Sequence, residues 1–141
     1  MKKYFLLLLP FLIGCTTTAE RNVLNSLSAM GLVLDDKYEV VSISESQIDG
    51  GEARNFTVTI SAGDTKRLAA DMRANYDVGQ PPLSYEEAMG TFRANVGGVS
   101  IVNSTTSGYV LDMNDAGSIY SKVHIDTINN KVDYKYFSKL Y

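Results

Sequence analysis

Two kinds of hydrophobic spacing divide this chain into predicted helices and predicted strands. From about Glu20 to Leu32, apolar residues recur every three or four positions, which is the spacing of one face of an α-helix. The apolar positions are Val23, Leu24, Leu27, Met30 and Leu34. Either this stripe packs into the core, which we favour, or it lies on a lipid surface. Similar spacing predicts a second helix over about Thr65–Tyr76, with Asp64 as its N-cap.

A third helix is predicted over about Tyr85–Val96 because its start carries a capping box. Ser84 and Glu87 are three residues apart, so each side chain can satisfy a free backbone N–H of the other. Gly97 and Gly98 end this helix in the prediction, since glycine is favoured just after a helix C-terminus.

The strands are predicted from apolar and polar residues that alternate with a period of two. Tyr38–Ile48 and Arg54–Ala62 form a predicted hairpin around Asp49-Gly50-Gly51. Four more strands follow the helices, at about Val99–Asn103, Tyr109–Asn114, Ser118–Ile128 and Lys131–Phe137.

The order of these elements predicts the fold class. It reads α-β-β-α-α-β-β-β-β and lacks the regular βα alternation of a doubly wound parallel sheet. We therefore expect an α+β domain with a mostly antiparallel sheet of about six strands and about three helices.

The N-terminus has the pattern of an export signal. Lys2 and Lys3 precede Tyr4–Ile13, a ten-residue stretch that is apolar apart from Pro10 and the Tyr4 phenol. A membrane-spanning helix needs about 20 residues, so this stretch is too short to remain in the bilayer.

The next residues are similar to a family signature. Leu12-Ile13-Gly14-Cys15 resembles the lipobox of bacterial lipoproteins. The resemblance covers residues 1–15 and implies cleavage before Cys15, a diacylglyceryl group on its sulfur and acylation, as by palmitate, of its amine. Thr16 follows the cysteine, and by the same resemblance the lack of aspartate there implies an outer membrane anchor that faces the periplasm in a Gram-negative cell.

The resemblance divides the chain into three parts. Residues 1–14 are the predicted signal peptide, residues 15–19 the lipidated cysteine with a short tether, and residues 20–141 one globular domain. Removal of the signal takes away two lysines and no acidic residue, so the net charge moves from −3 to −5. Such an acidic domain is a poor candidate for nucleic-acid binding. One cysteine and one histidine exclude an internal disulfide and a histidine-rich metal site.

The candidate chemistry gathers on one strand. His124 shares a predicted face with Tyr120, Lys122 and Asp126. His124 and Asp126 are two residues apart and could touch, but no serine stands in a nucleophile elbow. We interpret this face as solvated and name the four residues as a possible partner-binding surface, because tyrosine is enriched at recognition surfaces. Val132, Tyr134 and Tyr136 are expected to face the core.

A second acidic stretch superficially resembles a calcium loop. Residues 112–117 begin with the aspartate and asparagine spacing of an EF-hand, but Ala116 and Val123 occupy two ligand positions. We interpret the stretch as an ordinary turn and expect no metal and no cofactor.

These observations favour a non-enzymatic function. We expect a membrane-anchored envelope lipoprotein whose domain binds another envelope protein or supports an assembly, with no catalytic constellation. The alternative is a periplasmic inhibitor or immunity protein that neutralises a toxin or hydrolase, because acidic domains associate rapidly with basic enzymes.

Overall fold

The structure, a computed structural model, describes residues 18–48, 50–74, 81–90, 100–115 and 118–139. The predicted signal peptide, Cys15 and residues 16–17 of the tether lie outside the described residues. The prediction of a tether is wrong for residues 18–19, because they already belong to the first helix. The predicted C-terminal ends of the second and third helices also lie outside the described residues. Within the part of the chain that is described, no helix is long and apolar enough to cross a membrane.

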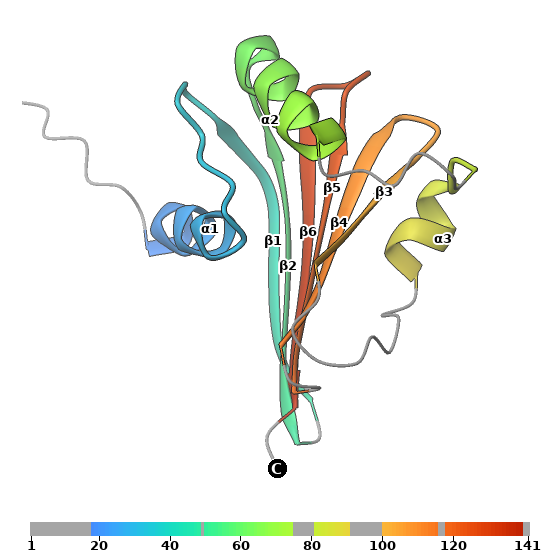
Figure 1. The fold of residues 1–141 in the computed structure, drawn as a ribbon. Coiled ribbons are helices and arrows are strands. Elements are labelled where there is room, and N and C mark those ends of the chain that lie inside the picture. The colour runs from blue at the N-terminus through green and yellow to red at the C-terminus, as the bar shows by residue number, and fades with distance from the viewer. Residues whose placement is uncertain (1–17, 49, 75–80, 91–99, 116–117, 140–141) are drawn as a thin grey trace, which may run out of the picture.

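Within these described ranges, a six-stranded sheet forms the centre of the domain (Figure 1). Its strand order is β1-β2-β6-β5-β4-β3, and every neighbouring pair is antiparallel. The strands are β1 Glu39–Ile48, β2 Gly51–Thr59, β3 Ser100–Ser104, β4 Gly108–Asp115, β5 Ile119–Asp126 and β6 Lys131–Lys139. In the part of the chain that the structure describes, three helices accompany this sheet in the predicted element order, which confirms the α+β fold class.

The helices cover opposite faces of the sheet. They are α1 Thr18–Ala29, α2 Ala62–Ala74 and α3 Tyr85–Gly90. Figure 1 shows α1 and α3 on the two sides of the sheet, with α2 across one end. Leu68 and Met72 of α2 join the core that Leu27 of α1 fills, so α1 and α2 share a face.

The apolar core lies between the sheet and the α1–α2 layer. Val23 is 0% exposed and Leu27 is 1% exposed, and each buried side chain of this size stabilises the fold by about 1.5–3 kcal/mol. The apolar stripe of α1 therefore faces the core, as we favoured. The alternative, in which this stripe lies on a lipid surface, is wrong. Val132 and Tyr134 are buried on the same side and Tyr136 packs against them, as predicted.

The face beneath α3 is polar, and it is buried. Lys122 is 2% exposed and His124 is 1% exposed, so the interpretation of a solvated strand face is wrong for these two residues. The alternation correctly placed them on the face opposite the core, but α3 packs over that face through Ala88 and Met89.

The second helix begins earlier than predicted. Ser61 is its N-cap, because the Ser61 hydroxyl accepts the N–H of Asp64 at 2.9 Å. Asp64 is buried in the first turn, and its carboxylate accepts the N–H groups of Asp35 and Asp36 at 3.1 and 3.0 Å. The prediction of Asp64 as the N-cap is thus wrong.

The capping box of α3 is confirmed. The N–H of Ser84 donates to the Glu87 carboxylate at 2.8 Å, and the N–H of Glu87 donates to the Ser84 hydroxyl at 3.2 Å. The interpretation of residues 112–117 as an ordinary turn is wrong for residues 112–115, which belong to β4, where Asp112 pairs with Lys122 of β5; residues 116–117 lie outside the described residues.

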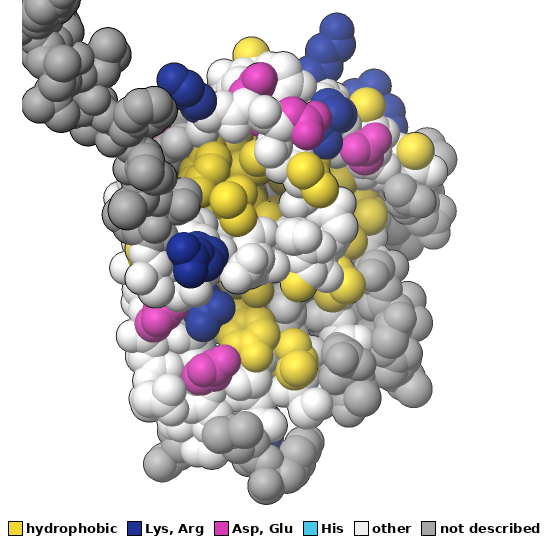
Figure 2. Space-filling view, turned by 90° about the vertical axis from the view of Figure 1, so that its left-hand side faces the viewer, with side chains coloured by type: hydrophobic (Ala, Val, Ile, Leu, Met, Phe, Trp, Pro, Cys, Tyr) yellow, Lys and Arg dark blue, Asp and Glu magenta, His cyan; other side chains and the backbone are white. Residues whose placement is uncertain are grey.

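Figure 2 views the α1 side of the molecule, where apolar side chains surface in patches between polar ones. A cleft of about 350 Å³ lies between α2 and the segment that follows α1, and its lining includes Met30, Leu32 and Met72.

Candidate functional site

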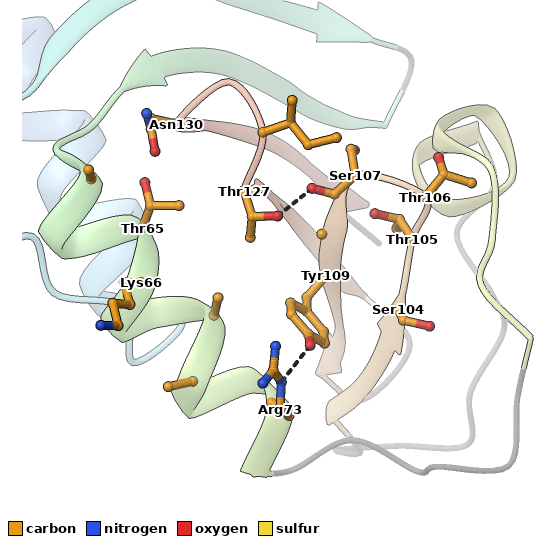
Figure 3. Close-up of a pocket in the computed structure, with 15 residues that line it drawn as sticks. Thr65, Lys66, Arg73, Ser104, Thr105, Thr106, Ser107, Tyr109, Thr127 and Asn130 are labelled. Atoms are coloured by element: carbon orange, nitrogen blue, oxygen red, sulfur yellow. Dashed lines mark hydrogen bonds between the residues drawn. The ribbon is translucent and has the colours of Figure 1, made fainter.

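A groove of about 750 Å³ runs between α2 and the turns at one end of the sheet (Figure 3). We call it the α2 groove. One wall is α2, and the other is formed by the β3–β4 turn, residues 104–109, together with the β5–β6 turn. Its lining is Ala62, Thr65, Lys66, Ala69, Ala70, Arg73, Ser104, Thr105, Thr106, Ser107, Gly108, Tyr109, Thr127, Ile128 and Asn130.

The α2 wall combines small and cationic side chains. Ala69 and Ala70 leave room for a ligand to approach the helix closely. Lys66 and Arg73 both line the groove and are exposed. Figure 3 shows Arg73 reaching across the groove, where it donates to the Tyr109 hydroxyl at 2.8 Å, whereas the end of the Lys66 side chain points away from the opposite wall in that view. The Arg73 guanidinium also lies 5.9 Å from the centre of the Tyr109 ring, within the range of a cation–π contact.

The position of the α2 wall is fixed by Asp64. The backbone bonds from Asp35 and Asp36 tie the first turn of α2 to the segment after α1, and Arg67 pairs with the same carboxylate. Burial alone would raise the pKa of Asp64, but the Arg67 hydrogen bond and the two backbone N–H groups outweigh it and hold the pKa below its ordinary value.

The opposite wall is a turn rich in hydroxyl groups. The N–H of Thr105 donates to the carbonyl of Gly108 at 2.8 Å and closes the turn. Gly108 is required because a Cβ there would lie 1.9 Å from the carbonyl oxygen of Ile125. Thr127 donates both its N–H and its hydroxyl to the Ser107 carbonyl, each at 2.8 Å, which joins the two turns (Figure 3).

The segment before α3 braces the same turn. The N–H of Leu83 donates to the carbonyl of Ser104 at 3.0 Å, and the Leu83 carbonyl accepts the N–H of Thr106 at 3.1 Å. The groove wall and the cover of the polar sheet face are therefore one hydrogen-bonded unit.

His124 lies directly behind this turn. Its Nε2 is 3.0 Å from the hydroxyl of Thr105 and 3.2 Å from the hydroxyl of Ser107. On the other side, Nδ1 is 3.8 Å from a carboxylate oxygen of Asp133, and the edge of the Tyr85 ring contacts the imidazole at a centroid distance of 5.2 Å.

Asp133 is held in its charged form by its neighbours. Burial would raise the pKa of Asp133, but adjacent His124 and a hydroxyl bond from Thr57, at 2.7 Å, outweigh burial and lower that pKa. Burial, together with the negative charge of Asp133, raises the pKa of Tyr85.

Two lysines fix α3 over the sheet. Lys122 donates to the carbonyl of Ala88 and Lys135 to that of Met89, both at 2.8 Å. These carbonyls belong to the last turn of α3, where the helix dipole favours a cation. Lys122 also pairs with buried Asp112 at 3.2 Å, so its charge is neutralised where it is buried.

Ser107, His124 and Asp133 have the order of a nucleophile, a base and an orienting carboxylate. The geometry does not favour that chemistry. The 3.8 Å gap to Asp133 exceeds hydrogen-bond range, and the hydroxyl nearest to His124 is that of buried Thr105.

Oxyanion stabilisation is also unsupported at Ser107. The N–H groups of Thr106 and Gly108, on either side of it, already donate to the carbonyls of Leu83 and Thr105. Removing one oxyanion donor costs an acyl-transfer enzyme about 3 kcal/mol in transition-state stabilisation. His124 is better explained as a brace for the turn.

The four residues predicted as a partner-binding surface do not form one exposed surface. Lys122 and His124 are buried, whereas Tyr120 is half-buried and packs on Phe137 at a ring centroid distance of 6.1 Å. Asp126 accepts the N–H groups of Ile128 and Asn129, at 2.9 and 3.0 Å, and so holds the β5–β6 turn.

Sequence reasoning did not identify the α2 groove, although it contained two signals. Lys66 and Arg73 are seven residues apart on one helix, which places them on the same face. The second signal is the run of four hydroxyl residues at positions 104–107 followed by Gly108, a composition typical of a turn.

Comparisons with models of protein families, with curated proteins and with solved structures gave no match for this chain. Within the described ranges, no group of three or more histidine, cysteine, aspartate or glutamate residues is placed to hold a metal ion.

Proposed function

We propose that this protein is a lipid-anchored lipoprotein of the cell envelope whose folded domain binds another envelope protein and catalyses no reaction. Residues 1–15 support the anchor through their resemblance to lipoprotein signals, with Cys15 as the lipidated residue. In a Gram-negative cell the domain would face the periplasm from the outer membrane.

The α2 groove is the observation that carries the binding function. Of the fifteen described residues that line it, two are cationic and none is acidic, although the whole chain has a net charge of −3. A local excess of cations on an acidic chain favours the association of an anionic partner at this place, and the packing of the fold does not require it.

Rigid walls also favour binding. The turn on one side is held by His124, Thr127 and Leu83, and α2 on the other side is held through Asp64. A site whose walls are already ordered loses less conformational entropy when the ligand binds. The alternative of an inhibitor directed at a basic enzyme gains no support from a cationic groove.

Site-specific photo-crosslinking in cells tests this function. We expect a photoreactive amino acid at Ala70, which lines the groove and is exposed, to form one discrete adduct with an envelope protein. The matched control is Ser44, which is exposed on the edge strand β1, away from the groove. An absence of adducts from Ala70, or the same adducts from both positions, would contradict the proposal.

A further inference from the structure

The α2 groove presents hydrogen-bond donors along one wall. Lys66 carries three donors and no acceptor, and the Arg73 guanidinium carries five donors and no acceptor, of which Nε is occupied by Tyr109. The alanines between these two cations bring no acceptor of their own apart from helix carbonyls.

The hydroxyl wall adds groups that can either donate or accept. Thr127 already uses its donor on Ser107, and the Ser107 hydroxyl already contacts His124. With no carboxylate among the described lining residues, the groove has no strong acceptor for the many hydroxyl donors of a sugar. A ligand rich in acceptors fits this lining better, and carboxylate side chains are the strongest such acceptors in proteins.

The spacing of the two cations sets the spacing of the ligand's charges. Lys66 and Arg73 are separated by seven residues of helix, which is about 10 Å along the axis on nearly the same face. A polyproline II segment rises about 3.1 Å per residue with three residues per turn, so side chains three apart project in one direction about 9 Å from each other.

We propose that the α2 groove binds an extended segment of a partner protein that carries acidic residues three positions apart. The two carboxylates pair with Lys66 and Arg73, and the backbone of the segment lies over Ala69 and Ala70 toward the hydroxyl wall. This inference rests on the proposed binding function, and it adds the chemistry of the ligand and its spacing.

Fluorescence anisotropy with the purified lipidated protein in non-ionic detergent tests the inference. The probe is a fluorescein-labelled peptide Ser-Glu-Pro-Pro-Glu-Pro-Ser. Two controls are its double glutamine version and a peptide of identical composition with adjacent acidic residues, Ser-Pro-Glu-Glu-Pro-Pro-Ser. We expect the spaced acidic peptide to bind about tenfold more tightly than either control, and the binding to weaken as salt is raised.

Two matched double variants separate the groove from general electrostatics. The combination of Lys66→Glu and Arg73→Glu should abolish binding of the spaced peptide. The combination of Arg21→Glu and Lys37→Glu makes the same charge change at exposed positions outside the groove and should leave the affinity within about twofold of wild type.

Equal affinity for the three peptides, or equal losses in the two double variants, would overturn the inference. So would binding of a short-chain anionic phospholipid in place of the peptides, since that would assign the groove to a lipid headgroup. Failure of the peptide-binding inference can be distinguished from failure of the proposed protein-binding function. If Ala70 crosslinks to an envelope protein while the peptides show no acidic preference, the ligand chemistry is wrong and the binding function stands.

Discussion

At the scale of single residues, the structure depends on carboxylates that accept several hydrogen bonds at once. Asp64 joins the start of α2 to the segment after α1 and to Arg67. Asp133 on β6 accepts the hydroxyl of Thr57 from β2 and lies 3.8 Å from the imidazole of His124 on β5. Each carboxylate has a pKa below its ordinary value, so each stabilises the folded state only while it is charged.

Asp64→Asn should therefore destabilise the domain in a pH-dependent way. At pH 7 we expect a loss of about 2 kcal/mol in the free energy of unfolding, because a buried, charged acceptor is removed. The folded-state pKa lies below the unfolded value of about 3.9, so the stabilisation is complete well above that pH and disappears as the pH falls through the folded pKa. The difference in the free energy of unfolding between wild type and Asp64→Asn should therefore shrink as the pH is lowered.

Urea unfolding at pH 7 and at about pH 3 measures both effects. Glu39→Gln is the control, because Glu39 is exposed at the start of β1, and it should change stability by less than about 0.5 kcal/mol. A variant at Asp64 as stable as wild type at pH 7 would contradict this account of the residue.

Individual side-chain partners were the least predictable feature from sequence. The sequence suggests a contact between His124 and Asp126, which are two residues apart on one strand. The structure instead places Asp133 of β6 opposite His124. That pairing depends on the register of the hairpin formed by β5 and β6. The register is set by the turn after Asp126, in which Asn130 has a left-handed conformation with φ 53°. Alternation fixes which face a residue occupies, but the register decides which residue it meets.

At the scale of elements, the local signals located the helices and strands but not all of their ends. Serine and aspartate are both favoured at the N-cap, so the type of residue alone does not decide between the predicted cap Asp64 and the observed cap Ser61. The choice is made by distant backbone N–H groups, which engage Asp64 and leave the cap to Ser61. The capping box at Ser84 was predictable because both of its partners lie in one turn.

The end of α1 has an equally local cause, which a glycine substitution tests. Gly31 has φ 74°, and Leu32 donates its N–H back to Leu27 at 2.9 Å, which is the pattern of a Schellman motif. Nothing lies within 4 Å of a Cβ built at Gly31, so Gly31→Ala should cost about 1 kcal/mol through its backbone conformation alone.

Gly90→Ala is the matched control for that substitution. Gly90 also has no atom within 4 Å of an added Cβ, but its φ is not positive. The free energy of unfolding of the Gly90→Ala variant should stay within about 0.5 kcal/mol of wild type or rise, because alanine has a higher helix propensity than glycine. Thermal unfolding of the two variants compares them directly, and equal losses would show that conformation at Gly31 is not the cause.

At the scale of the whole molecule, the two faces of the sheet are used differently. The α1–α2 face holds the apolar core, and the opposite face buries charged side chains under the short helix α3. The fold class followed from the sequence because it depends on element order. The burial of Lys122 and His124 did not, because a strand pattern does not reveal which helix packs on a polar face.

The groove was unpredictable for the same reason. Its walls come from α2 and from turns more than 30 residues later, and only the order of strands in the sheet brings them together. The sequence can display the cations of one wall and the hydroxyl groups of the other, but not their juxtaposition.

The proposed lipid anchor is also tested at this scale. Cys15→Ala should abolish incorporation of a palmitate analogue and release the domain from the membrane fraction, because the substitution removes the sulfur at which the proposed acyl chains are attached. Metabolic labelling followed by membrane fractionation measures both results. Undiminished labelling of the variant would mean that Cys15 is not the lipidated residue.

The central claim is that the α2 groove is where the partner binds, and Ala70→Trp tests it most directly. Ala70 is exposed and lines the groove, so the indole should fill part of the cavity without disturbing the core. The measurement is the amount of partner recovered with the purified protein after crosslinking in cells, for wild type and variant of equal thermal stability. We predict that recovery falls to background in the variant, and recovery equal to wild type would contradict the claim.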